Sequence, residues 1–188
     1  KTDTDMFNSE VYKNRRRALL SKMEAQGAKG IAIFLGNADA PTNYRGNDYK
    51  FRQDSSFLYF WGVDEPWFAA ILDLDNSDEC LYGNDVDIDD IIWMGPQPTV
   101  ASKGEAIGCS KTLPLGEFDK AVAAAVSAGR TVHFLPPARY YNQMKLAELT
   151  GIPNSGVRKV APAAAGGASE ELVKAVVALR LIKEQCEI

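Results

Sequence analysis

The feature that most constrains the fold is an alternation of short apolar runs with longer helical patterns along the chain. The run GIAIFLG at 30–36 is rich in β-branched residues and bounded by glycines, which is typical of a buried strand. The runs at 56–62 and 67–75 predict two further strands, with a turn at VDEP (63–66) between them. Because such strands alternate with helical segments, the sequence predicts an α/β fold with helices layered on a sheet.

Capping residues and glycines mark the other expected elements. Asn8 or Ser9 can cap the first helix, and Ser169 can cap the last. The stretch PAAAGG at 162–167 is the one linker-like segment. We expect helices at 8–27, 116–129, 138–151 and 168–188, strands at 79–83, 130–137 and 156–162, and an acidic segment after Gly83 that starts a helix and stops at Gly95.

Size and charge exclude several classes of partner. A chain of 188 residues is long enough for one domain with a buried core. Its net charge of -4 does not favour nucleic acid or an anionic membrane, because both require a basic footprint. The one basic run, 15–17, lies in a helical pattern and is interpreted as a solvated helix face. No apolar run approaches the roughly 18 residues that a membrane span needs.

The cysteines and the chain start bear on the cellular compartment. Cys80, Cys109 and Cys186 are widely spaced and odd in number, so we do not expect a disulfide framework. We expect a reducing, cytoplasmic compartment instead. The first ten residues contain no apolar signal core. The sequence begins at Lys1 rather than Met, so removal of a leader stays open.

A search for self-contained chemistry finds little. His133 stands alone in an apolar strand pattern, which favours a core residue over a metal ligand or a base. The acidic stretch from Asp85 begins like a calcium loop but has Asp90 at the glycine position and Pro96 at the final glutamate position. Phosphate-binding loops and nucleophile elbows are also absent from the sequence.

The most unusual stretch is YKFRQDSSFLYFWGVDEP at 49–66, where a polar cluster (52–56) directly precedes bulky aromatic residues. Arg52 offers five donors and Asp54 can accept in a bidentate manner, so a partly buried network is one interpretation. The other is that some of these side chains face a ligand or a partner subunit. We expect the cluster to hold the loop that leads into a central strand.

This stretch resembles the amino-terminal domain of the Xaa-Pro aminopeptidase and prolidase family. The resemblance continues in YKNRRRALLSKM at 12–23, IIWMG at 91–95 and LRLIKEQCEI at 179–188, and so covers 7–188. The positions that match the family motif are Phe51, Arg52, Gln53, Asp54, Ser55, Phe57, Tyr59, Phe60, Gly62, Glu65 and Pro66.

The resemblance implies a three-layer α/β/α domain around a mixed central sheet. It implies that residues 1–168 form a non-catalytic domain and that 169–188 form a helix leading into a catalytic domain outside this chain. In the family that catalytic domain holds two divalent metals, often manganese, and no residue here matches their ligands. We therefore expect no catalytic and no metal-binding residue in this chain, and no peptidase activity from it alone.

The implied parent is an aminopeptidase or dipeptidase that cleaves beside proline. Its expected partners are the catalytic domain of the same protein, proline-containing peptides, and further copies in a homodimer or homotetramer. The resemblance also raises Trp93, and less strongly Arg52 and Tyr49, as contacts to the substrate of a neighbouring subunit. For Trp93 a core position stays open as the alternative. The structural motif comprises Phe51, Arg52, Gln53, Asp54, Ser55, Glu65 and Pro66.

Two other functions remain open from the sequence. Creatinase-like amidinohydrolases share the two-domain plan, and a free-standing binding or scaffold module is also compatible with a domain that lacks its own chemistry. The Arg-Gln-Asp-Ser block followed by Glu-Pro favours the proline-specific peptidase.

Overall fold

The computed structural model describes residues 7–44, 46–87, 92 and 95–187. Strands and helices alternate along most of these residues, as the apolar runs predict. In chain order the elements are α1 (Ser9–Ala25), β1 (Ile31–Leu35), α2 (Ser55–Trp61), β2 (Ala69–Asp73), β3 (Asp78–Tyr82), α4 (Val100–Ala106), β4 (Thr112–Leu113), α5 (Leu115–Ser127), β5 (Val132–His133), α6 (Tyr140–Thr150), β6 (Val160–Ala161), β7 (Ala168–Ser169) and α7 (Glu170–Arg180), with short 3₁₀ turns at Ala163–Ala165 and Gln185–Glu187.

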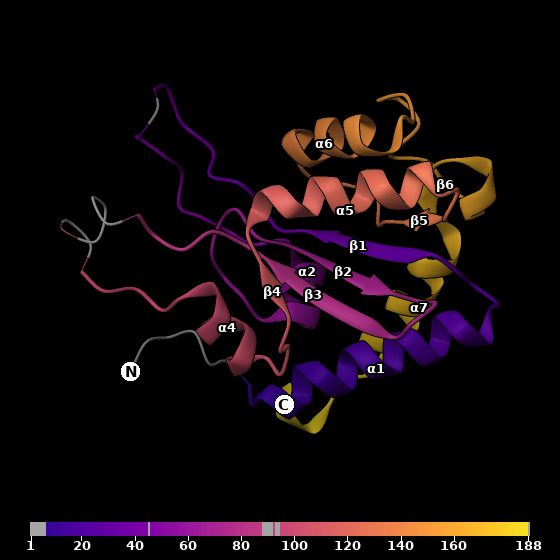
Figure 1. Cartoon of the computed structure of the whole chain (residues 1–188), viewed down its shortest axis with the longest axis horizontal. Helices are drawn as coiled ribbons and strands as arrows, with labels where there is room; N and C mark the ends of the chain where they lie inside the picture. Colours follow the sequence, from indigo (N-terminus) through magenta and orange to yellow (C-terminus); the bar gives the residue numbers. More distant parts are fainter. Residues whose placement is uncertain (1–6, 45, 88–91, 93–94, 188) are drawn as a thin grey trace.

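The main sheet is mixed and has the strand order β4-β3-β2-β1-β5. β2 pairs antiparallel with both β1 and β3, whereas β5 runs parallel to β1 and β4 runs parallel to β3. The carboxyl ends of β1, β3, β4 and β5 therefore lie at the same end of the sheet. That end is on the left in Figure 1, where α4 and the long loop after β1 also lie.

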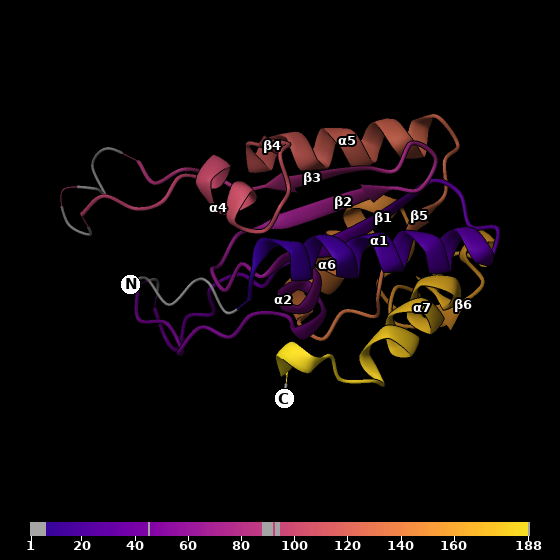
Figure 2. The ribbon, with the colours of Figure 1, turned by 90° about the horizontal axis from the view of Figure 1, so that it is seen from below.

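Helices cover both faces of the sheet. α5 and α6 lie on one face, and α1, α2 and α7 lie on the other, as Figures 1 and 2 show. Side chains along β1 alternate between the two cores: Ile31 and Ile33 pack on the α5–α6 side, and Ala32 and Phe34 on the opposite side. The expected three-layer α/β/α arrangement with a mixed sheet is confirmed.

The prediction of a strand at 56–62 is wrong, because this segment forms the short buried helix α2. The carboxylate of Asp54 accepts hydrogen bonds from the backbone N–H groups of Ser56 and Phe57, which caps the helix start. Gly62 ends the helix at a φ of 64°, and its N–H donates to the Leu58 carbonyl. A seven-residue apolar run is compatible with either state, and here the two caps decide for helix.

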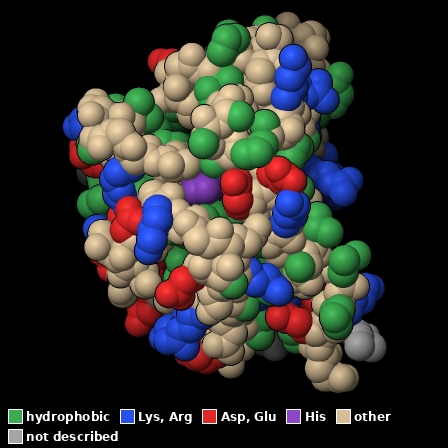
Figure 3. All heavy atoms as spheres, turned by 90° about the vertical axis from the view of Figure 1, so that its right-hand side faces the viewer, with side chains coloured by type: hydrophobic (Ala, Val, Ile, Leu, Met, Phe, Trp, Pro, Cys, Tyr) green, Lys and Arg blue, Asp and Glu red, His purple; other side chains and the backbone are tan. Residues whose placement is uncertain are grey.

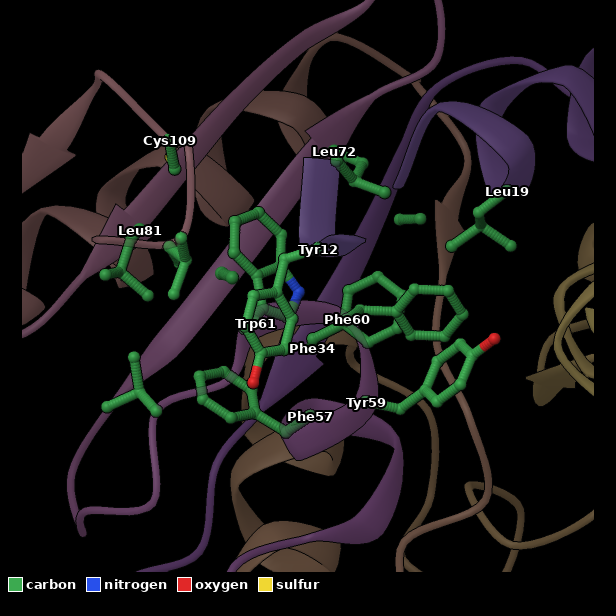
Figure 4. Close-up of a cluster of buried hydrophobic side chains, with 14 of the residues drawn as sticks. Tyr12, Leu19, Phe34, Phe57, Tyr59, Phe60, Trp61, Leu72, Leu81 and Cys109 are labelled. Carbon is green, nitrogen blue, oxygen red and sulfur yellow. The ribbon is translucent and has the colours of Figure 1, made fainter. Parts of the chain in front are cut away.

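The aromatic residues of α2 form the centre of one core. Phe57, Phe60 and Trp61 are fully buried beneath α1 and β1. Figure 4 shows them grouped with Tyr12 and Phe34. The Phe34 and Phe60 rings lie 5.5 Å apart in a tilted arrangement. This burial is what stabilises a helix too short to persist alone in water.

The interpretation of 15–17 as a solvated basic face is wrong for two of its three residues. Arg15 and Arg16 are buried, and only Arg17 is exposed. Arg16 donates two hydrogen bonds to the Glu79 carboxylate, from Nε and from Nη2, each 2.8 Å long. It also donates to the carbonyl of Phe60. Arg15 donates to the carbonyl of Tyr59. The two guanidinium groups thus supply hydrogen-bond donors to carbonyls in the last turn of α2.

Several expected boundaries shift. The last helix ends at Arg180 rather than continuing to 188, and Glu184, beyond it, pairs with Arg15 at 2.8 Å. The expected strands at 130–137 and 156–162 shorten to two residues each, and α4 and β4 were not predicted. The linker-like stretch 162–167 holds a 3₁₀ turn between β6 and β7. Most of the expected acidic helix lies outside the described residues, and 84–87 are not helical.

Six other predicted helices and strands are confirmed. The helices at 8–27, 116–129 and 138–151 correspond to α1, α5 and α6, and the strands at 30–36, 67–75 and 79–83 correspond to β1, β2 and β3. Ser169 caps α7 by accepting a hydrogen bond from the Leu172 N–H. The division of the chain at residue 168 stays a prediction.

Candidate functional site

The amide of Gln53 is the centre of the motif. Its Oε1 accepts hydrogen bonds from the N–H groups of Asn37 at 2.7 Å and Asp54 at 2.9 Å. Its Nε2 donates to the carbonyls of Val63 at 3.0 Å and Glu65 at 2.8 Å. The side chain is 5% exposed, so all four bonds form in a largely dry environment. Gln53 therefore ties the end of β1 to the segments on both sides of α2.

Asn37 extends this network toward α6. Its Nδ2 donates to the Arg52 carbonyl at 2.8 Å, and its Oδ1 accepts from Asn142 Nδ2 at 3.2 Å. Its own carbonyl accepts from the N–H of Trp67 at 3.1 Å. We call Asn37, Gln53 and Asn142 the amide hub, because together they connect β1, the motif and α6 through side-chain amides.

The interpretation of Arg52 and Asp54 as members of a partly buried network holds for Asp54 but not for the side chain of Arg52. The Asp54 carboxylate caps α2, and the exposed Arg52 takes part in the hub through its backbone carbonyl. Phe51 is half-buried, and Ser55 is the exposed first residue of α2. The motif leads into a helix rather than the expected strand, and its assignment as a structural motif stays a prediction.

Glu65 and Pro66 anchor the other end of the motif. The Glu65 carboxylate pairs with Lys103 Nζ of α4 at 2.5 Å, and Pro66 is half-buried. Trp67 follows with a φ of 65°, an unusual conformation for a bulky residue. Its indole N–H donates to Asp39 Oδ2 at 3.0 Å, and its ring meets Tyr141 edge-on at 5.4 Å.

A pocket of about 240 Å³ opens beside the amide hub. It lies where β1, β3 and β4 end and where α5 begins, so backbone and side chains from distant parts of the sequence line it. Apolar contacts come from Leu35, Phe68 and Phe118, and aromatic contacts from Trp67 and Tyr141. Its polar lining comprises Asn37, Asn84, Asp119, Asn142 and Lys145.

The three residues expected to contact substrate fall into two groups. Tyr49 is 65% exposed and Arg52 is exposed, so both are accessible from solvent. Trp93 lies outside the described residues. The pocket itself was not predicted, although the Gly36-Asn37 pair directly after a buried strand was a usable signal, because strand ends are common ligand positions in α/β folds.

The single histidine lies at the far end of the sheet from the pocket. His133 is 2% exposed, with Nδ1 2.7 Å from Ser169 Oγ and Nε2 3.0 Å from the Lys29 carbonyl. Burial lowers its pKa, although the contacts with Lys29 and Glu171 oppose this shift. The expectation of a core histidine is confirmed.

The same end carries mixed charge. Figure 3 shows acidic and basic side chains interspersed over it. Arg130 donates to Asp73 at 2.6 Å and to Asp75 at 2.7 Å, next to the turn between β2 and β3. Its hydrogen bond lowers the pKa of Asp75, with a further bond from the Gly30 N–H. This face does not favour a partner of one charge sign.

The described part of the chain shows neither a metal-ligand cluster nor a membrane-spanning helix. There, no group of three or more His, Cys, Asp or Glu residues is arranged to hold a metal ion. Within the same residues no helix combines the length and apolarity that crossing a bilayer requires. Cys80, Cys109 and Cys186 are unpaired, and burial raises the pKa of the Cys109 thiol to about 11.

Most of the chain matches the sequence model of a known protein family. The sequence model described as "Aminopeptidase P, N-terminal domain" matches residues 12–133, from the first turn of α1 to the end of β5. The chain belongs to this family. The match includes the amide residues Asn37 and Gln53 and most of the residues that line the pocket.

This chain is similar in sequence to known Xaa-Pro aminopeptidases. It is 27% identical to the Escherichia coli Xaa-Pro aminopeptidase over 159 residues, covering 82% of this chain and 33% of that protein. It is 31% identical to mouse Xaa-Pro aminopeptidase 3 over 117 residues, covering 57% of this chain and 23% of that protein. The chain thus spans about a third or less of the length of these relatives.

Solved aminopeptidase P structures share the fold. The Pseudomonas aeruginosa aminopeptidase PepP matches with a TM-score of 0.72 at 22% identity, over 96% of this chain and 40% of its own. Escherichia coli aminopeptidase P with the inhibitor Pro-Leu matches with a TM-score of 0.69 at 20% identity, over the same shares.

Proposed function

We propose that this chain works as the amino-terminal accessory domain of a metal-dependent exopeptidase that cleaves Xaa-Pro bonds. The observation that carries the proposal is the family match over 12–133, which contains the whole motif at 51–66. The relatives that match are Xaa-Pro aminopeptidases, which favours an aminopeptidase over a dipeptidase or an amidinohydrolase. In this proposal the domain restricts substrate access and supports a homodimer or homotetramer.

The amide hub supports a positioning role. It fixes the loop after β1 at the pocket end of the sheet, which brings the exposed Tyr49 and Arg52 to that end. Large aromatic and arginine side chains are effective contacts at interfaces. We propose that these two residues contact a proline-containing peptide held by a neighbouring subunit, and Trp93 joins them on sequence grounds.

Bond cleavage itself belongs to the catalytic domain of the same protein in this proposal. Two divalent metal ions, often manganese in the family, would supply an activated water there. The described residues of this chain do not form a matching ligand set, so the domain contributes position and access rather than chemistry. A cytoplasmic location belongs to the same proposal, because three unpaired cysteines suit a reducing compartment.

A peptidase assay tests the proposal. The 188-residue chain is expected not to hydrolyse an Xaa-Pro peptide with Mn²⁺ present, whereas the full natural protein is expected to do so. In the full protein, Tyr49→Ala and Arg52→Ala are each expected to lower kcat/KM about tenfold without moving the unfolding midpoint, as loss of one substrate contact predicts. Arg17→Ala, an exposed change on α1, is the control.

Three results would overturn the proposal. The first is metal-dependent hydrolysis by the 188-residue chain itself. The second is a stop codon directly after Ile188 in the coding sequence, which would favour a free-standing binding module. The third is hydrolysis of a guanidino compound in place of Xaa-Pro peptides by the full protein, which would favour an amidinohydrolase.

A further inference from the structure

The pocket beside the amide hub has the position of a ligand site. In α/β sheets, ligands commonly bind at the carboxyl ends of strands, where helices begin. The pocket lies at that end of β1, β3 and β4, against the first turns of α5 and α6. Its volume of about 240 Å³ is smaller than the roughly 300–1,000 Å³ of pockets for drug-sized ligands, so a molecule of amino-acid size suits it.

The aromatic wall of the pocket is held in a costly conformation. Trp67 keeps a φ of 65°, which a bulky residue adopts only when its surroundings enforce it. The backbone bond to Asn37 and the indole bond to Asp39 supply that enforcement. Trp67 is nevertheless 44% exposed, so packing in the core does not explain the strain. Trp67 and Tyr141 together form an apolar surface that a ligand can contact.

The polar lining brings one positive and one negative charge into the same space. Lys145 Nζ lies 2.5 Å from Asp119 Oδ2, and both side chains line the pocket. Because this pair is neutral overall, it gives no net attraction to a simple anion or cation. A ligand that carries both charges on neighbouring atoms can pair with both residues at once.

We propose that this pocket binds a free α-amino acid with a large apolar side chain, as its zwitterion. The ligand carboxylate pairs with Lys145, its ammonium group pairs with Asp119, and its side chain packs against Trp67, Tyr141 and Leu35. The inference does not depend on the peptidase function proposed above, because it rests on the pocket and requires no catalysis.

Binding can be followed on the 188-residue chain by two-dimensional ¹H–¹⁵N NMR. The indole signal of Trp67 is assigned from its loss in Trp67→Phe, and L-phenylalanine is the probe. A saturable shift of that signal at millimolar probe is expected. N-acetyl-L-phenylalanine and L-phenylalaninamide each lack one charge and are expected to bind about tenfold more weakly, as loss of a charged hydrogen bond predicts.

Matched variants locate the charges. Asp119→Asn and Lys145→Met are each expected to weaken L-phenylalanine binding about tenfold. Glu117 and Lys120 form a similar ion pair on α5 at 2.6 Å but do not line the pocket. Glu117→Gln and Lys120→Met are therefore expected to bind as the unaltered chain does.

The proposal has clear contrary outcomes. Absence of a saturable Trp67 shift overturns it. Equal affinity for L-phenylalanine and its two singly charged analogues also overturns it, because the pocket would then recognise only the apolar ring. A failed peptidase assay leaves this result unaffected, so the two proposals can fail separately.

Discussion

Buried polar side chains in this domain act as connectors between segments. Gln53 joins four backbone groups, and Arg16 joins α1 to α2, β3 and the end of α4. Each makes four hydrogen bonds, which is how a polar group is accommodated in a core. The sequence indicated that the 52–56 cluster was structural. It could not indicate that Gln53 rather than Arg52 was the buried member, because burial depends on which segments close over the cluster.

Replacement of Gln53 tests the contribution of the amide hub to stability. Gln53→Leu leaves two N–H groups and two carbonyls without partners in a buried site, so the free energy of unfolding is expected to fall by about 3–5 kcal/mol. Gln143 on α6 is half-buried and makes one hydrogen bond, to the Asn154 carbonyl. Gln143→Leu is thus expected to cost about 1 kcal/mol. Urea unfolding followed by circular dichroism measures both, and equal losses would contradict the hub.

The helices and strands of this fold differ in how strongly the local sequence predicts them. β1 and β2 are apolar runs, β3 is a short segment closed by Gly83, and a glycine follows each of α1, α5 and α6 within two residues, so all six were predicted. The two-residue strands β4 and β5 depend on neighbours for their pairing and have little local signal of their own. α2 was misassigned because its aromatic residues suit a strand, although Asp54 and Gly62 already marked both helix ends.

The glycine that ends α2 is in close contact with α1. Gly62 and Gly129 both have a positive φ, of 64° and 70°. A Cβ at Gly62 would come within 2.4 Å of the Tyr12 ring, whereas a Cβ at Gly129 meets nothing within 4 Å. Gly129→Ala is therefore expected to cost about 1 kcal/mol through strain alone. Gly62→Ala is expected to cost about 3 kcal/mol, because overpacking adds to the strain.

Thermal unfolding of both variants measures the difference. Gly129→Ala serves as the matched control for the backbone conformation. A drop in Tm for Gly62→Ala no larger than that for Gly129→Ala would show that Tyr12 moves aside without cost.

At the scale of the whole molecule, the two ends of the sheet have different characters. The end where β1, β3 and β4 finish gathers the amide hub, the pocket and the exposed Tyr49 and Arg52. The opposite end carries interspersed charges and the buried His133 (Figure 3). The Gly36-Asn37 pair after β1 marked a strand end in the sequence, but the lining of the pocket could not be predicted, since Trp67, Asp119 and Lys145 meet there only through the folded arrangement of strands and helices.

The contacts of His133 couple β5 to the start of α7 and to the segment before β1. Nε2 faces a carbonyl and must carry a proton, so in the neutral ring Nδ1 accepts the Ser169 hydroxyl proton. Ser169 Oγ also lies 2.9 Å from the Glu171 carboxylate, and one proton cannot serve both acceptors. Protonation of Nδ1 would reverse the first bond and turn the hydroxyl toward Glu171.

This network predicts a pH dependence of stability. Because burial lowers the pKa of His133 in the folded state, the unfolded chain binds its proton at higher pH than the folded chain does. Above the unfolded value of about 6.5 the stabilisation is complete, and it is expected to decline as pH falls from about 7 to about 5. The pKa of Glu171 is also lowered, but its contribution is lost only at more acidic pH, below the ordinary range of glutamate. The urea midpoint is expected to fall as pH is lowered across this interval. Because the chain has one histidine, this dependence on pH is expected to disappear in His133→Gln and to persist in Glu171→Gln. An unchanged slope in His133→Gln would assign the dependence to other groups.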